Sequence, residues 1–170
     1  MKKSLVVYFS HNKENYVKGK IVYLDEGNTK VIAKKIQSIM ECDIFEIQPL
    51  HEYPSDYHEC TEVAKLEQKQ NARPKIKNMV SCFQKYETIY LGFPNWWGTM
   101  PMVVQTFLEE YPFENKTIYP FCTHEGSGMG NSVEDIHQLC PQSHIEKPLA
   151  IRGSQVHECD ELLKNWLLKE

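Results

Sequence analysis

The sequence predicts an α/β fold, a three-layer sandwich in which helices cover both faces of a five-stranded parallel sheet. Two observations predict it. Five short β-rich runs alternate with segments whose apolar residues recur at helical spacing, which is typical of repeated strand and helix units. The segments between successive runs are also long enough for the crossover connections that parallel neighbours require.

The first half of the chain alternates between strand and helix. Residues 4–9 (SLVVYF) lack polar alternation, as expected of a strand covered on both faces. Residues 29–41 follow as a helix with isoleucines on one side and lysines opposite. Residues 43–47 (DIFEI) are the second expected strand. The polar residues 57–82 have a helical pattern that we expect to break near Pro74.

The third strand is expected at residues 87–93 (ETIYLGF). It precedes a helix with the sequence MVVQTFLEEY, residues 102–111. Thr99 is a suitable cap for this helix, and the first turn accepts Pro101 because proline needs no amide partner there.

The fourth strand is expected at residues 116–122 (KTIYPFC), where Pro120 indicates a kink or an unpaired amide. Ser132 and Asp135 then resemble a capping box that opens a helix reaching Cys140.

A fifth strand is expected within residues 144–151, and Ser154 is expected to cap a last helix. The apolar residues expected to face inward from that helix are Val156, Leu162, Leu163 and Trp166. No internal repeat, low-complexity tract or long linker is present, so residues 1–170 are expected to form a single domain.

Composition excludes several classes of function. With 170 residues, 41% of them hydrophobic and 25% charged, the chain has the make-up of one soluble globular domain. A net charge of −4 argues against nucleic acid as a partner, and the apolar runs are too short to span a membrane. Without a secretory pattern after Met1, a cytoplasmic protein is expected. The six cysteines are expected to be reduced, and His58-x-Cys60 and His157-x-Cys159 match no zinc pattern, so no metal is expected.

The loops that follow strands of a parallel sheet meet at one edge, where such sheets bind ligands. The loop after the first strand combines small polar side chains with the start of a helix, whose free N–H groups and positive dipole end suit a phosphate. The alternative is that an amide or hydroxyl side chain there only caps the helix. The candidate residues in this loop are Ser10, His11, Asn12, Gly27, Asn28 and Thr29.

The loops after the third and fourth strands suit a flat ligand. Two adjacent tryptophans at this edge indicate a planar partner, although either could instead pack into the core. The glycine-rich loop allows backbone amides to approach a ligand closely, and it is not a dinucleotide fingerprint. The candidate residues are Pro94, Asn95, Trp96, Trp97 and Gly98 in the first loop, and Thr123, His124, Glu125, Gly126, Ser127 and Gly128 in the second.

Four stretches carry a family resemblance: LVVYFS, GNTK, LGFPNWWGTMP and PFCTHEGSGMG, which begin at residues 5, 27, 91 and 120. They resemble flavodoxins, in particular the bacterial flavodoxin-like proteins with a WWG loop, and the resemblance extends over essentially the whole chain. It implies a five-stranded parallel sheet in the order 2-1-3-4-5 and noncovalently bound FMN. It also implies that Ser10, Asn28 and Thr29 hold the phosphate and that residues 94–98 and 123–128 flank the ring.

One segment departs from the family pattern. Residues 13–26 stand between Asn12 and Gly27, where the pattern runs on directly. A surface excursion is expected, and the alternative is that Tyr16 or Tyr23 folds over the flavin or forms a docking surface.

The resemblance implies an electron carrier that works between donor and acceptor redox proteins and has no catalytic residues of its own. A low potential is expected because the phosphate loop offers hydroxyls and amides, with Lys30 already inside the helix, and because Trp96 or Trp97 would stack on the ring. The alternative is an FMN-dependent NAD(P)H:quinone-type reductase, although the sequence contains no second nucleotide motif. A phosphoacceptor domain of the same topology needs acidic residues where Ser10 and Pro94 stand. Three side chains have two interpretations: His124 as proton relay or surface residue, Cys122 as nucleophile or packing residue, and Glu125 as a charge near the ring or a solvated carboxylate.

Overall fold

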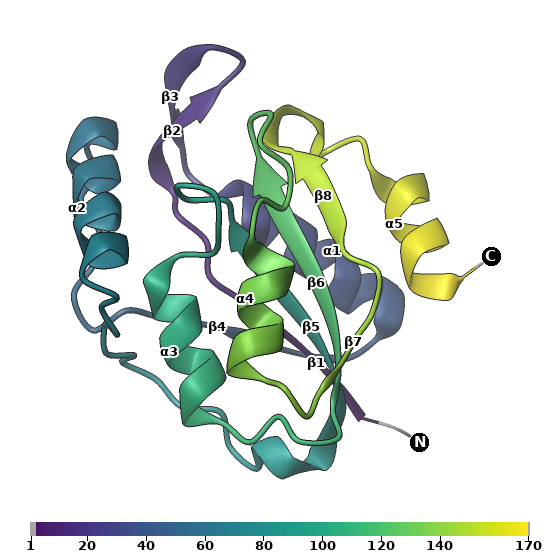
Figure 1. Cartoon of the computed structure of the whole chain (residues 1–170). Helices are drawn as coiled ribbons and strands as arrows, with labels where there is room; N and C mark the ends of the chain where they lie inside the picture. Colours follow the sequence, from purple (N-terminus) through teal and green to yellow (C-terminus); the bar gives the residue numbers. More distant parts are fainter. Residues whose placement is uncertain (1–2, 170) are drawn as a thin grey trace.

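The computed structural model describes residues 3–169 and shows a parallel sheet between two layers of helices (Figure 1). Its main strands lie in the order β4-β1-β5-β6, followed by a short outer pair. The predicted order 2-1-3-4-5 is therefore confirmed, with one difference in detail: the fifth strand is split in two. The strands are β1 (Lys3–Tyr8), β4 (Asp43–Glu46), β5 (Tyr86–Pro94), β6 (Thr117–His124), β7 (His144–Ile145) and β8 (Leu149–Arg152).

Pro120 accounts for the split fifth strand. On one side of β6 it lies opposite Leu91 of β5. On the other side, β7 pairs with residues 117–118 and β8 pairs with residues 121–124, so Pro120 falls in the interruption between them. A proline cannot donate to a sheet ladder, and the outer strand is absent where that donor is missing.

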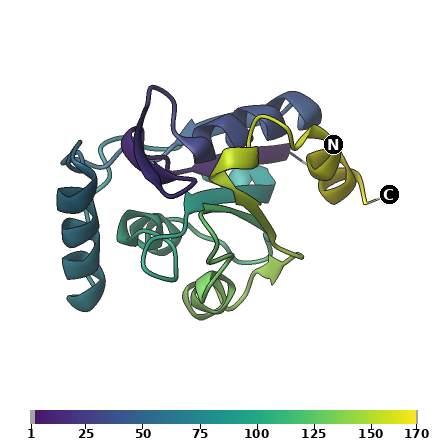
Figure 2. The same ribbon diagram turned by 90° about the horizontal axis from the view of Figure 1, so that it is seen from above.

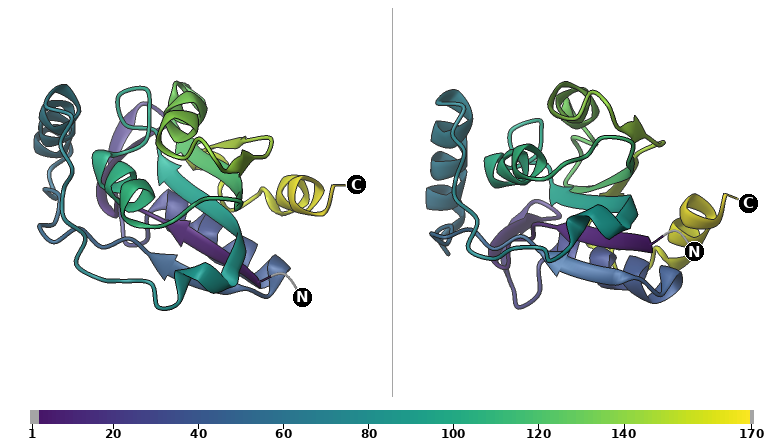
Figure 3. Two further views of the ribbon diagram at one scale, coloured as in Figure 1. Left: turned by 60° about the horizontal axis from the view of Figure 1, so that its bottom comes forward. Right: turned by 90° about the horizontal axis from the view of Figure 1, so that it is seen from below.

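Helices cover both faces of the sheet, as predicted. One layer consists of α1 (Asn28–Met40) and α5 (Asp160–Leu168), and its core includes Ile32 and Leu163. The other consists of α3 (Met102–Glu110) and α4 (Ser132–Leu139), packed around Phe107. The remaining helix, α2 (Tyr57–Lys69), stands apart from the sheet beside α3 (Figure 3).

Strand β1 is buried from both sides, as its uninterrupted apolar run predicts. Leu5 and Val7 belong to the core under α3 and α4, whereas Val6 and Tyr8 belong to the core under α1 and α5. This alternation follows from the two-residue period of a strand.

Three predicted helix caps, at Thr99, Ser132 and Ser154, are wrong. Thr99 does not cap α3, since the helix begins after Pro101 and the Thr99 hydroxyl donates to the Asp135 carboxylate. Asp135 is thereby removed from the predicted capping box, and the Ser132 hydroxyl donates to the Met129 carbonyl at 2.6 Å.

The end of the chain differs in a similar way. Ser154 lies in a 3-10 turn, η2 (Gly153–Gln155), and α5 begins only at Asp160. Leu162, predicted to face inward, is about half exposed, whereas Val156 and Leu163 are fully buried as expected.

The polar stretch 57–82 is helical only in its first half. It forms α2 up to Lys69, so the chain leaves the helix before Pro74, as predicted. A second 3-10 turn, η1 (Phe83–Lys85), precedes β5. Within residues 3–169, no helix combines the length and the apolar character needed to cross a bilayer.

Residues 13–26, expected to be a surface excursion, form an antiparallel hairpin. It consists of β2 (Lys13–Val17) and β3 (Lys20–Leu24), joined by Lys18 and Gly19. Both turn residues have positive φ, 51° and 79°, as a two-residue turn of the right twist for a hairpin requires. The hairpin projects at the end of the sheet where β1, β5 and β6 finish (Figure 1).

A substitution at Gly92 tests the packing between β5 and β6, where Gly92 lies opposite Phe121. A Cβ at this position would lie 2.1 Å from the ring of Phe121, which is fully buried on β6. We expect Gly92→Ala to lower the free energy of unfolding in urea by about 1–3 kcal/mol, because the overpacked ring must shift.

The control is the double variant with Phe121→Leu, which removes the clash. The two substitutions should be less damaging together than the sum of their separate effects. Additive effects would show that this contact does not limit the packing.

Candidate functional site

A cavity of about 460 Å³ opens at the carboxyl ends of β1, β5 and β6, a volume in the usual range for small-molecule sites. Its walls come from the start of α1, one face of α2, the hairpin and the loops after β5 and β6. Eleven of the residues singled out in the sequence line it: His11, Asn28, Thr29, Pro94, Asn95, Trp96, Trp97, Thr123, His124, Glu125 and Ser127.

The start of α1 forms part of the wall of this cavity. The Lys30 N–H donates to Ser10 Oγ at 3.1 Å and the Val31 N–H to the Gly27 carbonyl at 3.2 Å. The earlier N–H groups, of Asn28 and Thr29, have no acceptor within the helix because they precede its first hydrogen bond. Both residues line the cavity, so the positive end of the helix dipole is available to an anion there.

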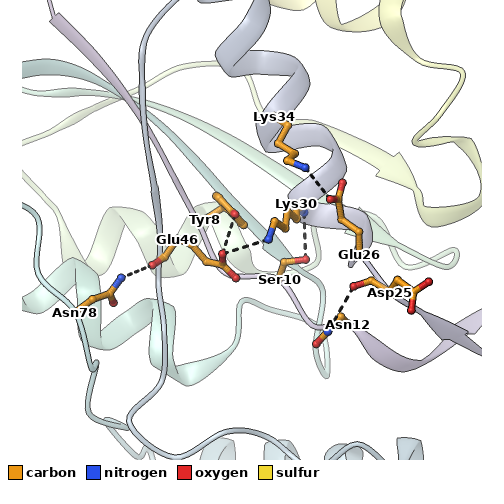
Figure 4. Close-up of polar contacts among 9 residues, drawn as sticks. All are labelled: Tyr8, Ser10, Asn12, Asp25, Glu26, Lys30, Lys34, Glu46 and Asn78. Carbon is orange, nitrogen blue, oxygen red and sulfur yellow. Dashed lines mark hydrogen bonds and ion pairs between the residues drawn. The ribbon is translucent and has the colours of Figure 1, made fainter.

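Ser10, Gly27 and Asn12 shape this loop without lining the cavity. A Cβ on Gly27 would lie 2.2 Å from Ser10 Oγ and 2.6 Å from the His11 carbonyl, so only glycine fits. Asn12 Nδ2 donates to the Asp25 carbonyl at 3.5 Å across the base of the hairpin (Figure 4). Ser10 and Asn12 instead line a neighbouring hollow of about 410 Å³.

Lys30, the first cation of α1, is already paired. The Lys30 ammonium lies 3.6 Å from Glu46 Oε2, which also accepts from the Tyr8 hydroxyl at 3.1 Å (Figure 4). Glu46 lines the neighbouring hollow and not the main cavity. An anion bound at the helix start would therefore be held by hydrogen bonds, with Lys30 engaged elsewhere.

Asn95 joins the loop after β5 to the loop after β6. Its backbone N–H donates to the Thr123 carbonyl at 2.9 Å, and its Nδ2 donates to the Gly128 carbonyl at 2.7 Å. Its Oδ1 accepts from the Gly98 N–H at 2.9 Å. One side chain thus fixes the conformation of both loops.

The glycines of these loops act through the backbone. The Gly98 carbonyl accepts from the Asn131 N–H at 2.7 Å, and a Cβ on Gly130 would lie 2.1 Å from that same carbonyl oxygen. Gly98, Gly126 and Gly128 have positive φ and do not line the cavity. Their contribution is the close approach of the two loops.

The two tryptophans occupy different positions in a tight turn: Trp96 begins the turn and Trp97 lies at its tip. Trp96 and Thr99 exchange backbone hydrogen bonds, and the residues between them, Trp97 and Gly98, have φ of 55° and 85°. Positive φ at both central positions defines a hairpin-type turn, and it is unusual for a residue as bulky as tryptophan. Trp97 is therefore held at the tip of the turn, a constraint of the kind found at functional sites.

Trp96 packs towards the core. Its ring meets Phe9 at 5.3 Å and Tyr53 at 4.9 Å between centroids, both edge to face. Trp97 is 49% exposed beside the cavity, and its Nε1 donates to the Thr61 carbonyl of α2 at 2.9 Å. The hydrogen bond holds the indole in place, and Lys65 Nζ lies over the ring, 5.1 Å from its centroid. A flat ligand would stack on the face that Lys65 leaves uncovered.

Burial and neighbouring charges favour the neutral form of two histidines of the cavity. Burial, and then the charge of Lys13, lowers the pKa of His11; burial, and then Arg152, lowers the pKa of His124. His124 Nδ1 accepts from the Gly126 N–H at 2.9 Å. Among the described residues, His11 Nε2 and Glu125 Oε1 are buried polar atoms without a hydrogen-bond partner.

Cys122 and Cys60 lie close to the site as protonated thiols. Burial raises the pKa of each to about 12, so neither is a ready nucleophile. The Cys122 thiol donates to the carbonyls of Thr123 and Gly128 at 3.4 Å. In the described part of the chain, no three His, Cys, Asp or Glu side chains gather in a way that could hold a metal.

Two parts of the cavity wall were missed by the sequence analysis. The hairpin contributes Glu14 and Asn15 as well as Tyr16, which the sequence offered only as an alternative. Helix α2 contributes a stripe whose i, i+3, i+4, i+7 spacing was the available signal for one shared face. Its members are Tyr57, Cys60, Thr61 and Ala64.

Comparison with known proteins gives the family and the fold. The flavodoxin family model matches residues 18–170. A solved structure of a candidate flavoprotein from Bacteroides uniformis ATCC 8492 is 27% identical, with a TM-score of 0.78 over 98% of both chains. The flavoprotein of Lactobacillus acidophilus NCFM, solved in complex with FMN, is 21% identical, with a TM-score of 0.67 over 93% of this chain and 98% of its own. No curated protein matches.

These structures share the arrangement of the sheet and helices found here, which makes the fold a flavodoxin-like three-layer sandwich. The match to the family model extends from the hairpin through every later element and includes the loops after β5 and β6. This chain belongs to the flavodoxin family.

Proposed function

We propose that this protein carries electrons, one at a time and at low potential, between redox enzymes, using FMN held in the 460 Å³ cavity. The observation that carries the proposal is the combination of free helix amides at the start of α1 and an exposed indole, Trp97, in one cavity. The first suits a phosphate and the second a flat ring. FMN, the cofactor of the family, has both groups.

The residues present fit this cofactor. The N–H groups of Asn28 and Thr29 are free to hold the phosphate, and Gly27 keeps the adjoining backbone close because no Cβ intervenes. The unpartnered His11 Nε2 and Glu125 Oε1 offer polar contacts of the kind that a buried ligand would satisfy. Trp97 supplies the stacking surface.

Three features support a low potential, and they act against the positive charges of Lys13, Arg152 and Lys65 beside the cavity. Bound FMN supplies the electron-accepting ring, and the surrounding protein adjusts its potential. Lys30 is engaged with Glu46, so the phosphate charge is not neutralised by that cation. The net charge of −4 and the electron-rich face of Trp97 act in the same direction, since both disfavour additional negative charge nearby.

The partners we propose are a donor and an acceptor protein, and the proposed location is the cytoplasm. The six cysteines, all of which lie in the described part of the chain, are free thiols, as is usual in a reducing compartment.

Substitution of the tryptophans separates cofactor binding from folding. We expect Trp97→Ala to raise the Kd for FMN about tenfold, because a lost stacking contact is worth roughly 1–1.5 kcal/mol, with little change in the free energy of unfolding. Trp96→Ala should instead lower that free energy by about 2–4 kcal/mol, because its ring packs against Phe9 and Tyr53. Flavin fluorescence titration and urea denaturation measure the two effects. Unchanged FMN affinity in Trp97→Ala would show that this ring is not the stacking partner.

Anaerobic reduction of the FMN-loaded protein tests the carrier function. The visible spectrum should change in two separate one-electron steps, the second at a lower potential than that of free FMN measured under the same conditions. Purified protein should not oxidise NADH or NADPH steadily when no partner is present. A single two-electron step accompanied by steady NAD(P)H oxidation would instead identify a reductase.

A further inference from the structure

The hairpin forms part of the cavity wall and is fixed at its base and at its tip. At its base, Glu14 Oε2 accepts from the Tyr57 N–H at 2.7 Å, and the Glu14 N–H donates to the Ser55 carbonyl at 3.3 Å. At its tip, the Lys18 N–H donates to Glu125 Oε2 at 3.3 Å. The hairpin therefore connects the start of α2 with the loop after β6, and a view from above shows it beside α2 (Figure 2).

The register of the hairpin directs one aromatic residue into the site. Glu14 and Tyr16 share a face of the ribbon with their cross-strand partners, Tyr23 and Ile21. Of these aromatic residues, Tyr16 lines the cavity, whereas Tyr23 is 65% exposed and does not. Tyr16 also stacks on Tyr57 of α2, with centroids 6.0 Å apart and ring planes 28° from parallel.

The loop after β6 offers no Phe, Tyr or Trp side chain, since residues 123–130 read THEGSGMG, and its one ring is the smaller imidazole of His124. A flat ring has two faces, and Trp97 can cover only one of them. If the other face remained in water, the benefit of burying that apolar area would be lost. Tyr16 is the aromatic residue that the hairpin brings to the cavity, and at 43% exposure it has ring surface to spare.

We propose that Tyr16 is a second stacking residue of this site and that the hairpin positions it against the face of the flavin ring that Trp97 leaves uncovered. This inference rests on the proposed binding of FMN. It assigns a binding role to the segment that separates Asn12 from Gly27, and it gives Glu125 a positioning role, because its carboxylate holds the tip of the hairpin.

The test compares FMN binding by the full chain and by three variants: Tyr16→Ala, Tyr16→Phe and Tyr23→Ala. Tyr16→Ala should raise the Kd about tenfold and, at saturating FMN, weaken the visible circular dichroism of the bound flavin, because an unstacked ring is less asymmetrically held. Tyr16→Phe keeps the ring and should restore both the Kd, to within about twofold, and the dichroism. Tyr23→Ala is the matched control on the same face of the hairpin and should behave as the unsubstituted protein does.

The outcomes distinguish this inference from the proposed function. If the unsubstituted protein binds FMN and Tyr16→Ala matches it in both Kd and dichroism, the role of Tyr16 is refuted and FMN binding stands. If Tyr16→Ala and Tyr23→Ala weaken binding equally, the hairpin acts through its fold and the stacking contact is refuted. If the unsubstituted protein binds no FMN, the proposed function fails, and this inference fails with it.

Discussion

The candidate site depends most on the Asn95 side chain, which connects the loops after β5 and β6. Its amide donates to the Gly128 carbonyl and accepts from the Gly98 N–H, so one side chain sets the separation of two loops that are distant in sequence. Hydrogen bonds in a partly buried setting are stronger than those in water and costly to leave unmade. The left-handed backbone at Trp97 persists because these bonds and the Gly98–Asn131 contact over-determine the turn.

The interruption of the sheet at Pro120 has a related effect on the site. Because the outer strand stops and restarts there, β8 pairs only with the last residues of β6, from Phe121 to His124. This pairing brings Gly153 beneath the site, where a Cβ would lie 2.4 Å from Asn28 Nδ2 and 2.6 Å from Glu125 Oε1. The turn after β8 thus packs against Asn28 and Glu125, which line the cavity, while Gly153 itself does not line it.

Sequence periodicity was enough to predict the strands of the main sheet, the helices on both faces and the edge at which the site lies, because burial on a sheet imposes a regular pattern. It did not predict β2 and β3, which form the hairpin. The cap at Thr99 was not predictable, since its hydroxyl bonds to Asp135, 36 residues away, in preference to nearby amides. The two tryptophans are adjacent and chemically identical, and only the turn conformation separates their environments. The Lys18-Gly19 pair, which stands between two segments of alternating polar and apolar residues, was a sequence signal for a hairpin. The family resemblance did not indicate a function for this segment.

The hydrogen bond between the hairpin tip and the loop after β6 also affects how the cavity wall can move. The turn itself is fixed by one hydrogen bond from an exposed backbone N–H, whereas the strand before it is fixed by the Glu14 carboxylate and by the Tyr16–Tyr57 contact. Surface segments with few buried contacts open far more often than the core does. Because the turn is held by so little, its release would loosen one wall of the cavity without any alteration of the sheet beneath.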